Sequence, residues 1–495
     1  ERNYHIFYQL CAGLSQVPGL PDNLRLKDVL DFEYTKTCES VAGVDDASDF
    51  REVLDCMASL GFEREDRDSV LRIVAAALHL GNLTFSVCQR DTQDGVAIDE
   101  MPQAAMICEL LGIETQQLQS VLEHKTMQDP LTKKTIYRPH TLESASHTRH
   151  SMAKVVYTRL FDWLVWRINE SISGQGSARK DLRRIGLLDI YGFEVFDNNS
   201  FEQLCINFAN EKLQQHFNNH MFTLEQQMYN REGIAWSHIT FQDNGPIIES
   251  LDRKPLGLFC LVDSECLMPS ATDSTLLAKI HSNFKNSGII SKPSRFASND
   301  FAVAHYAGEV IYNVETFLEK NTDKLHVDVV NLMKTSKMEL LQKLFTDPRF
   351  APEFAHKDDK NRREAARKSR RSSSNEPDKS VHQRQNFTIS MMFREQLEKL
   401  VEDLNKTNPR YVRCIKPNAN KQPGEFDSID VLRQLRCAGM LESIRIRRAG
   451  YAVRRPFKDF FTRFRVLAPH LAASGSDPDY RSLCQRLASE VEQRL

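Results

Sequence analysis

The sequence lacks the features that would place it in several common classes of protein. No Cys-x-x-Cys pair occurs among the eleven cysteines, so a zinc site built from cysteine pairs is disfavoured. The most apolar stretch, residues 70–80, is too short to span a bilayer and contains Arg72. No signal-peptide pattern opens the chain, and a net charge of −2 gives no reason to expect binding to nucleic acid or anionic lipid.

What the chain does have is size and an ordinary soluble composition. With 495 residues, it is too long for a single hydrophobic core and should divide into several subdomains. Hydrophobic residues make up 41% and charged residues 27%, as in typical globular proteins. The odd number of cysteines in so long a chain favours a reducing compartment. The chain does not begin with Met, and we expect it to be a truncated sequence.

The first part of the chain reads mainly as helices. Residues 70–80 and 152–172 repeat apolar side chains at helical spacing, and Gly81 is a typical helix end. One long stretch between these helices, residues 124–140, is irregular and partly basic. After a polar linker, the apolar run at residues 185–190 predicts a buried strand.

A long helix is predicted next. Ser200 and Gln203 form a capping-box pattern, and apolar residues then recur at helical spacing up to residue 231. A helix of about thirty residues is about 45 Å long at a rise of about 1.5 Å per residue. That length suits a connecting rod, although an ordinary long core helix would show the same pattern.

The rest of the chain alternates short elements with one linker. Residues 240–350 mix short helices and strands, whereas residues 353–386 have no apolar period. Within that linker, residues 357–372 carry eight Lys and Arg against three Asp and Glu, a local net charge of +5. The remaining predicted elements are a helix over 387–405, a strand over 410–416 and two short helices over 428–450, separated near Gly439.

The clearest chemical pattern is the turn between the predicted strand and the long helix. Asp189 ends the apolar run, where many nucleotide hydrolases place a carboxylate that holds the water shell of Mg²⁺. Gly192 lets a backbone N–H approach a phosphate oxygen, and Glu194 adds a carboxylate that can pair with an Arg across a closing site. With the helix behind them, these residues suggest a sensor of a γ-phosphate.

These residues resemble the myosin motor head. Residues 189–196 are similar to its second switch, and residues 200–231 are similar to its relay helix. Other blocks follow in the order of that family over nearly all 495 residues. They are residues 2–10, after the first switch; 76–82 and 157–164, in the upper subdomain; 232–236, the relay loop with its tryptophan; 305–309 and 317–321, in the lower subdomain; and 410–418 and 434–439, which lead to the converter.

The resemblance implies an α/β fold of the P-loop NTPase-like myosin motor type. In that fold a central twisted sheet lies between large, mainly helical upper and lower subdomains, which are incomplete here. The implied division is an upper subdomain (1–183), a strand and second switch (184–199), a relay helix and loop (200–236), a lower subdomain (237–352), a basic surface loop (353–386), an actin-interface helix and central-sheet strand (387–427), paired short helices (428–455) and the start of the converter (456–495).

The resemblance also implies functional residues. Asp189, Gly192 and Glu194 take the catalytic positions, with Asp189 and Gly192 at the nucleotide and Asp189 acting on Mg²⁺ through its water shell. Water is the nucleophile, so Glu194 has a positioning and electrostatic role. The implied actin-binding residues are Leu397, Lys399, Leu400, Lys406, Arg410, Tyr411, Arg413, Lys416, Arg367, Lys368, Arg370 and Arg371, and the residues that couple relay and converter are Phe217, Trp236, Cys437, Gly439 and Gly450.

The implied protein is an actin-activated ATPase that moves a converter and lever, located in the cytoplasm on the actin cytoskeleton. Its substrate is ATP with Mg²⁺ and its partner is the actin filament, without nucleic acid or a membrane span. A light chain or calmodulin could bind a neck outside these residues. We expect Trp236 to report nucleotide binding by its emission, and Trp163 and Trp166 to report little.

Three features depart from the family pattern. No G-x-x-x-x-G-K-[ST] loop or first switch occurs, so we expect the 495 residues alone not to bind or hydrolyse ATP. Arg447 stands at the second reactive cysteine of the family, which leaves Cys437 alone. Lys134, beside Thr135, takes a position that is often acidic or phosphorylatable. The alternative is a non-enzymatic, actin-binding relic of a motor, and a phosphate loop upstream of Glu1 would decide between the two.

Two other patterns have plainer explanations. His216 and His220 have the spacing of a zinc-binding helix, but Phe217 stands where a metalloprotease needs Glu, so solvated or packed histidines are favoured. The apolar segment 256–268 resembles an actin-facing tip of the family. By sequence alone, however, three of its side chains should lie in the core: Leu258, Phe259 and Leu261.

Overall fold

The computed structural model divides the chain into two compact units, which are described separately. The first unit comprises Glu1–Gly186 with Asp323–Gln385, and the second comprises Leu187–Thr322 with Asn386–Leu495. The structure describes residues 2–14, 16–17, 20–21, 24–90, 93–128, 135–173, 183, 185–232, 243–268, 270–293, 299–322, 327–350, 388–420, 422–441, 444, 448, 453, 455–471 and 478–494.

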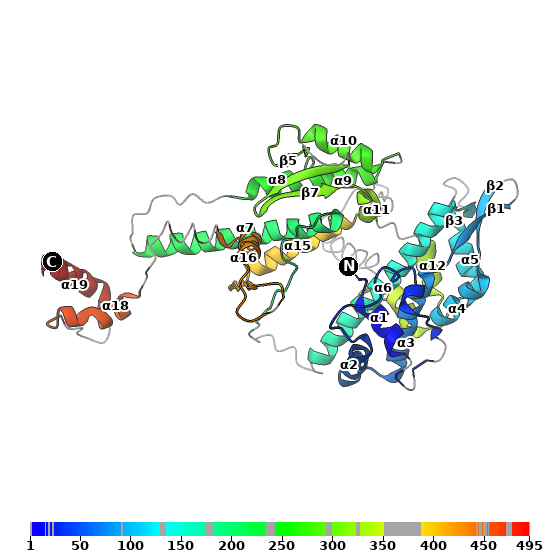
Figure 1. Ribbon diagram of the computed structural model, residues 1–495, viewed down its shortest axis with the longest axis horizontal. Coiled ribbons are helices and arrows are strands. Elements are labelled where there is room, and N and C mark those ends of the chain that lie inside the picture. The colour runs from blue at the N-terminus through cyan, green and yellow to red at the C-terminus, as the bar shows by residue number, and fades with distance from the viewer. Residues whose placement is uncertain are drawn as a thin grey trace, which may run out of the picture. The chain divides into compact units, whose positions relative to one another are not determined.

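The first unit is mainly helical (Figure 1). Its helices are α1 (His5–Gly13), α2 (Asp46–Ser59), α3 (Arg64–Gly81), α4 (Met101–Leu111), α5 (Thr115–Glu123), α6 (Leu142–Ser173), α12 (Val327–Lys334) and α13 (Glu339–Thr346), with a 3₁₀ turn η2 (Val29–Asp31). Two antiparallel hairpins complete it: β1 (Phe85–Arg90) with β2 (Gln93–Ile98), and β3 (His124–Gln128) with β4 (Thr135–Pro139).

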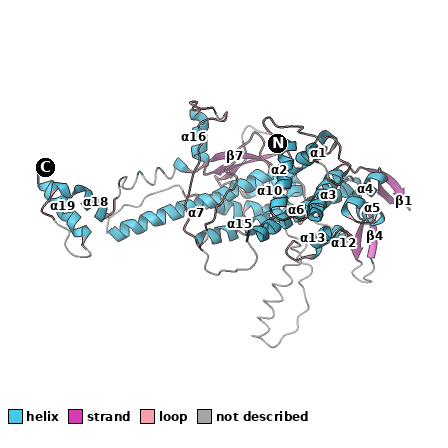
Figure 2. Ribbon diagram, turned by 90° about the horizontal axis from the view of Figure 1, so that it is seen from below, coloured by secondary structure: helices cyan, strands magenta, loops and turns pink. Residues whose placement is uncertain are grey.

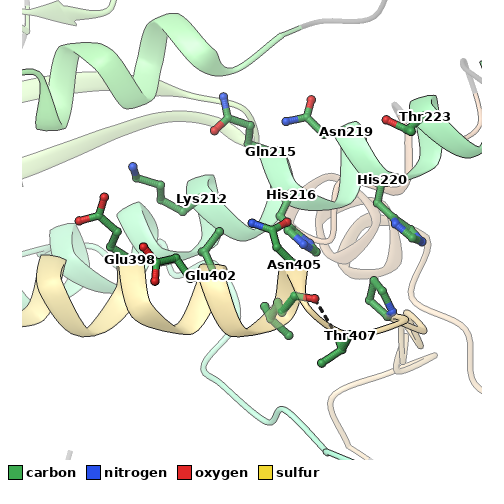
Figure 3. A pocket seen from close by; sticks show the side chains of 13 residues that line it. Lys212, Gln215, His216, Asn219, His220, Thr223, Glu398, Glu402, Asn405 and Thr407 are labelled. Atoms are coloured by element: carbon green, nitrogen blue, oxygen red, sulfur yellow. Dashed lines mark hydrogen bonds between the residues drawn. The ribbon is translucent and has the colours of Figure 1, made fainter.

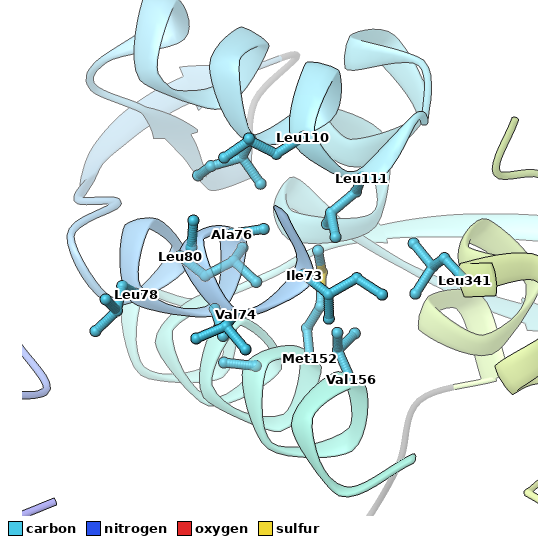
Figure 4. Packing of buried hydrophobic residues seen from close by; sticks show 14 of the residues in the cluster. Ile73, Val74, Ala76, Leu78, Leu80, Leu110, Leu111, Met152, Val156 and Leu341 are labelled. Carbon is cyan, nitrogen blue, oxygen red and sulfur yellow. The ribbon is translucent and has the colours of Figure 1, made fainter. Parts of the chain in front are cut away.

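The core of the first unit is built around α3. Every residue from Ile73 to the helix end at Gly81 is buried, because α4, α6 and α13 surround this part of the helix. Figure 4 shows Ile73 and Val74 of α3 among Met152 and Val156 of α6. The predicted helices at 70–80 and 152–172 are therefore confirmed. No helix of the described residues is both long enough and apolar enough to cross a membrane.

The prediction of irregular structure at residues 124–140 is wrong at both ends of that stretch. β3 and β4 pair with His124 opposite Pro139 and Gln128 opposite Thr135. The two strands form a local hairpin, and the side chains of β4 are mostly exposed, so no alternation of apolar and polar residues marked it in the sequence.

The second unit combines one small sheet with helices (Figure 2). Its sheet has the order β5 (Ile290–Ser291), β6 (Asp300–His305) and β7 (Gly308–Asn313), all antiparallel. Its helices are α7 (Phe201–Glu232), α8 (Gly245–Asp252), α9 (Leu258–Cys266), α10 (Asp273–Asn283), α11 (Phe317–Asn321), α15 (Ile389–Asn405), α16 (Ser428–Cys437), α18 (Phe457–Phe464) and α19 (Tyr480–Arg494), with a 3₁₀ turn η3 (Arg465–Leu467).

The long helix and the helix over 387–405 are confirmed by α7 and α15. In the predicted capping box at the start of α7, the Ser200 N–H donates to Gln203 Oε1 at 3.0 Å. Two short helices were predicted around Gly439; α16 ends at Cys437 and Gly439 has φ +65°, while most residues of the second helix lie outside the described part. The predicted core residues are also confirmed, since three side chains of α9 are buried: Leu258, Phe259 and Leu261.

Two predicted strands are absent from the described residues. Residues 185–190 and 410–416 form no ladder with any described segment. Ile185 and Leu187 are 95% and 96% exposed, and Val412 is 83% exposed, so these apolar side chains are not buried in a sheet. An apolar run becomes a buried strand only where neighbouring strands pair with it, and none of the described strands does. The described sheets are small and antiparallel.

Candidate functional site

The turn at residues 189–196 joins the unpaired apolar run to α7. The Asp189 side chain is exposed, and a Cβ placed on Gly192 would have no atom within 4 Å. A ligand oxygen therefore has room to approach the backbone at Gly192. The Glu194 side chain is half-buried, and its Oε2 accepts a hydrogen bond from Gln203 Nε2 at 3.5 Å.

Two asparagines hold this turn by its backbone. The Glu194 N–H donates to Asn207 Oδ1 at 2.8 Å, and Asn207 Nδ2 donates to the Glu194 carbonyl at 2.8 Å. Asn199 holds Phe196 in the same way, with distances of 2.8 and 2.9 Å. Asn199 Nδ2 also donates to the carbonyl of Ile311 in β7 at 3.0 Å, so the turn is fixed to α7 on one side and to the sheet on the other.

A stripe of buried polar residues runs along α7. It consists of Asn207, Glu211, Gln214 and Asn218, which lie three or four residues apart and are all at most 3% exposed. This spacing puts them on one face of the helix. The apolar residues of α7 predict the helix but do not reveal this stripe. The same spacing of amide and carboxylate side chains was the signal that could have revealed it.

At the middle of the stripe, Glu211 gathers three donors. Asn244 Nδ2 donates to Glu211 Oε2 at 2.6 Å, and the Tyr306 N–H donates to Oε1 at 2.9 Å. His305 Nδ1 lies 3.0 Å from Oε1, and His305 Nε2 lies 2.9 Å from the hydroxyl of Tyr312. Burial raises the pKa of the Tyr312 and Tyr306 hydroxyls, so both remain protonated donors.

The far end of the stripe touches the turn after α16. A Cβ on Gly439 would lie 2.3 Å from Gln214 Oε1, and the positive φ of this residue already favours glycine. The Tyr306 hydroxyl donates to the carbonyl of Cys437 at 2.5 Å. Burial raises the pKa of the Cys437 thiol, while the nearby Arg433 lowers it. Cys437 and Gly439 thus lie against α7 and the β6–β7 turn.

Aromatic and cationic contacts continue beyond the stripe. The rings of Phe217 and Tyr411 meet edge to face at 4.6 Å, and the Arg413 guanidinium lies 5.4 Å from the centre of the Phe217 ring. His216 Nδ1 lies 2.5 Å from the hydroxyl of Tyr411, and burial lowers the pKa of this histidine. His216 is thus packed against Tyr411, which confirms the prediction of a packed histidine.

A cavity of about 480 Å³ opens between α7 and α15 (Figure 3). Its walls combine polar and apolar side chains, and Lys212 on α7 lies opposite Glu398 and Glu402 on α15. No group of three or more metal-binding side chains occurs in the described part of the chain. This cavity was not predicted from the sequence, because its walls come from segments almost 200 residues apart.

The family model for the myosin head (motor domain) matches residues 1–494. The chain belongs to the myosin head family.

Several myosins share this sequence along nearly its whole length. The chain is 39% identical to Myosin-17 of Arabidopsis thaliana over 99% of this chain and 30% of that protein. It is 40% identical to Unconventional myosin-XV of Homo sapiens over 94% of this chain and 12% of that protein. It is 39% identical to Unconventional myosin-Vb of Homo sapiens over 99% of this chain and 26% of that protein. The chain therefore spans less than a third of the length of these relatives.

The myosin segment predicted to face actin is partly buried in the second unit. Leu397 is 6% exposed and packs in the core with the half-buried Leu400, so these two side chains face inward. The cationic side chains of this segment are exposed to solvent: Lys399, Lys406, Arg410, Arg413 and Lys416. Lys406 pairs with Asp403 at 2.9 Å. The backbone of Lys416 is bound by the Gln434 side chain at 2.8 and 3.0 Å.

Several predicted myosin residues lie outside the described residues. They are Trp236 and Gly450 of the coupling set, Arg367, Lys368, Arg370 and Arg371 of the basic linker, and Lys134 in the 124–140 stretch.

Proposed function

We propose that the chain is part of an actin-based motor that couples ATP hydrolysis to movement of a converter. Membership of the myosin head family supports this class of function. One observation supports the coupling: the polar stripe of α7 contacts the 189–196 turn at Asn207 and the turn after α16 at Gln214. A helix that contacts both turns can transmit a change in one turn to the other.

The turn at 189–196 is the proposed nucleotide-sensing part. Mg²⁺ bound with ATP would neutralise the charge that develops on the phosphates. Asp189 would hold the water shell of that ion, and its exposed carboxylate fits this role. Gly192 would donate its backbone N–H to the γ-phosphate, and the open space around it fits this approach. Glu194 would position the closed turn for attack by water.

The P-loop NTPase-like arrangement around a central twisted sheet is part of this proposal. Residues 185–190 and 410–416 would be strands of that sheet, and their exposed apolar side chains are consistent with such a place. The eight-part division of the chain is proposed with it, except that α12 and α13 pack in the core of the first unit and are assigned to the upper subdomain instead of the lower one. The start of the converter would be α18, η3 and α19, and the two helices share a small core of their own around Phe461 and Leu487.

The actin-binding part is proposed to be cationic. The basic linker at 357–372 and the exposed Lys399, Lys406, Arg410, Arg413 and Lys416 would face the acidic filament, whereas Leu397 and Leu400 would support α15 from within. With this partner, the protein would be located on the actin cytoskeleton, and a light chain or calmodulin would bind a neck outside these residues.

Steady-state phosphate release tests the proposal. It should be measured on the natural chain that contains residues 1–495, with and without actin filaments. Glu194→Ala should reduce the actin-activated rate by at least about tenfold, in the range of losses that follow removal of one group that stabilises a transition state. Glu202→Ala is the matched control, since this exposed carboxylate of α7 pairs with Lys320 at 2.7 Å and is not part of the turn. Equal rates for the two variants would contradict the role of Glu194.

A further inference from the structure

The side chain of Asn207 binds both backbone hydrogen-bonding groups of Glu194, as a neighbouring strand would do in a sheet. Asn207 accepts from the N–H and donates to the carbonyl of the same residue, both at 2.8 Å. The Tyr312 hydroxyl then determines whether the side-chain amide of Asn207 stays in this orientation. Asn207 Nδ2 also donates to the Tyr312 hydroxyl at 2.8 Å.

The hydrogen positions along this chain of contacts can be assigned in sequence. A backbone N–H only donates, so the Asn207 atom that faces the Glu194 N–H is Oδ1 and the other is Nδ2. The two hydrogens on Nδ2 go to the Glu194 carbonyl and to the Tyr312 oxygen, which is therefore an acceptor. The Tyr312 proton must then be donated elsewhere, and His305 Nε2 at 2.9 Å accepts it.

The tautomer of His305 follows from the same argument. With Nε2 as an acceptor, the ring proton of His305 lies on Nδ1 and is donated to Glu211 Oε1 at 3.0 Å. The hydrogen bonds therefore all run in one direction: Asn207 donates to Tyr312, Tyr312 donates to His305, and His305 donates to the Glu211 carboxylate. Each donated proton in this series has one acceptor.

Burial makes this arrangement rigid. Asn207, Tyr312 and Glu211 are 0% exposed, and the His305 side chain is 0% exposed as well. Water therefore cannot replace a lost partner, and an alternative orientation of any member would leave a buried polar atom unpaired. Burial also raises the pKa of Tyr312, so the hydroxyl keeps the proton that it donates to His305.

We propose that Tyr312, His305 and Glu211 are positioning residues that orient the Asn207 amide and thereby fix the backbone at Glu194. Asn207 and Glu211 lie one turn apart on α7, so the helix carries both ends of the hydrogen-bond chain. The inference rests on the proposed function only for the role of Glu194 in hydrolysis. The positioning itself is a property of these residues.

Hydrogen exchange at the Glu194 amide tests the proposal on the natural chain that contains residues 1–495. Tyr312→Phe removes the hydroxyl and nothing else, so exchange of this amide should become about fivefold to tenfold faster, roughly the factor that one hydrogen bond contributes. Tyr306→Phe is the matched control, because it removes a hydroxyl that is bound to the carbonyl of Cys437 and does not take part in the hydrogen bonds from Asn207 to Glu211. In the control, exchange at Glu194 should stay as in the unsubstituted chain.

Two results of the exchange experiment would overturn the proposal. Unchanged exchange at Glu194 in Tyr312→Phe would show that the hydroxyl does not orient Asn207, and equal acceleration in both variants would show general loosening. If Tyr312→Phe fails to fold, ¹⁵N spectra of selectively labelled histidine in the unsubstituted chain decide. The Nδ1–H tautomer of His305 supports the proposal and the Nε2–H tautomer contradicts it. Neither measurement uses ATP or actin, so its failure is distinct from failure of the proposed function.

Discussion

The side-chain amide of Asn207 binds both the N–H and the carbonyl oxygen of Glu194, at 2.8 Å in each case. Two turns further along the same face of α7, Gln214 lies against Gly439. The separation of these two positions is seven residues, or about 10 Å of helix at about 1.5 Å per residue. The proposed switch and the turn after α16 therefore contact one short length of helix.

The contact between Gln214 and Gly439 predicts a large effect of one methyl group. Gly439→Ala adds a Cβ that would lie 2.3 Å from Gln214 Oε1, at a residue with φ +65°. We expect a loss of about 2–4 kcal/mol in the free energy of unfolding, from left-handed strain together with overpacking. Chemical denaturation followed by circular dichroism measures it.

Gly424→Ala is the control for backbone strain alone. Gly424 has φ +80°, but an added Cβ would have no atom within 4 Å. Its expected cost is about 1–2 kcal/mol. Similar losses for the two variants would show that Gln214 moves aside at little cost, and that Gly439 is not tightly packed on α7.

The first unit should lose stability in acid through His150. Burial, and then the charge of Arg149, lower the pKa of His150 from its usual 6.5 to about 4, while its Nδ1 lies 2.8 Å from the Tyr34 hydroxyl. Between these two pKa values the unfolded chain binds a proton that the folded chain does not. Stability therefore rises with pH across this window, and falls as the pH drops from about 6.5 to about 4.

Urea unfolding monitored by the emission of Trp163 and Trp166 tests this in the first unit. His150→Gln cannot titrate, so its stability should fall less steeply than that of the unsubstituted chain between pH 6.5 and about 4. His281→Gln changes a histidine of the second unit and should keep the original pH dependence. Parallel pH curves for His150→Gln and the unsubstituted chain would contradict the assignment.

A buried carboxylate should anchor the start of α15. Asp263 Oδ1 accepts from Asn321 Nδ2 at 3.1 Å and from the hydroxyls of Thr388 and Ser390, while Oδ2 binds Arg394. Asp263→Asn leaves part of this set without a charged acceptor, so we expect a loss of about 3–5 kcal/mol in the free energy of unfolding. Thermal or urea unfolding measures the loss.

Asp252→Asn is the matched control for Asp263→Asn. Asp252 also pairs with Arg394, at 2.9 Å, but its side chain is 26% exposed. Water can replace part of this contact, so the expected loss is about 1 kcal/mol or less. Equal losses would mean that Asp263 contributes as an ordinary surface ion pair.

The basic linker should make binding to actin sensitive to salt. Residues 357–372 have a net charge of +5, and the Debye length falls from about 10 Å at 0.1 M to about 3 Å at 1 M ionic strength. Co-sedimentation with actin filaments should weaken as salt rises, and replacing Arg367, Lys368, Arg370 and Arg371 with Ser should flatten that dependence. Phosphorylation of Ser372 or Ser373 should weaken binding for the same reason. An unchanged salt slope in the Ser variant would exclude a role of the linker.

The helices could be predicted because their signal is local. Apolar side chains three or four residues apart predicted α7 over 200–231, and it runs from Phe201 to Glu232. The burial of Asn207 and Glu211 could not be predicted in this way. Polar residues at helical spacing usually form a solvated face, whereas here they contact Tyr312 and His305, about 100 residues away, and become interior.

Pairing between distant segments limited the rest of the prediction. The four partners of Asp263 lie 58 to 131 residues further along the chain, so no single sequence window contains them. Of the candidate site, the sequence motif predicts Asp189, Gly192 and Glu194, which lie within one short segment, and their roles stay a prediction. The motif could not predict that Asn207 of α7 holds this turn, since Asn207 is itself held by Tyr312 of β7, 105 residues away.

Co-sedimentation with actin filaments in the presence and absence of ATP tests the central proposal most directly. The sample should be the natural chain that contains residues 1–495, at fixed salt, with Glu194→Ala in parallel. We predict that the unsubstituted protein sediments with actin when nucleotide is absent and is released by ATP. Sedimentation that ATP does not change would indicate a non-enzymatic actin-binding protein, and no sedimentation in either condition would contradict the assignment of an actin-based motor.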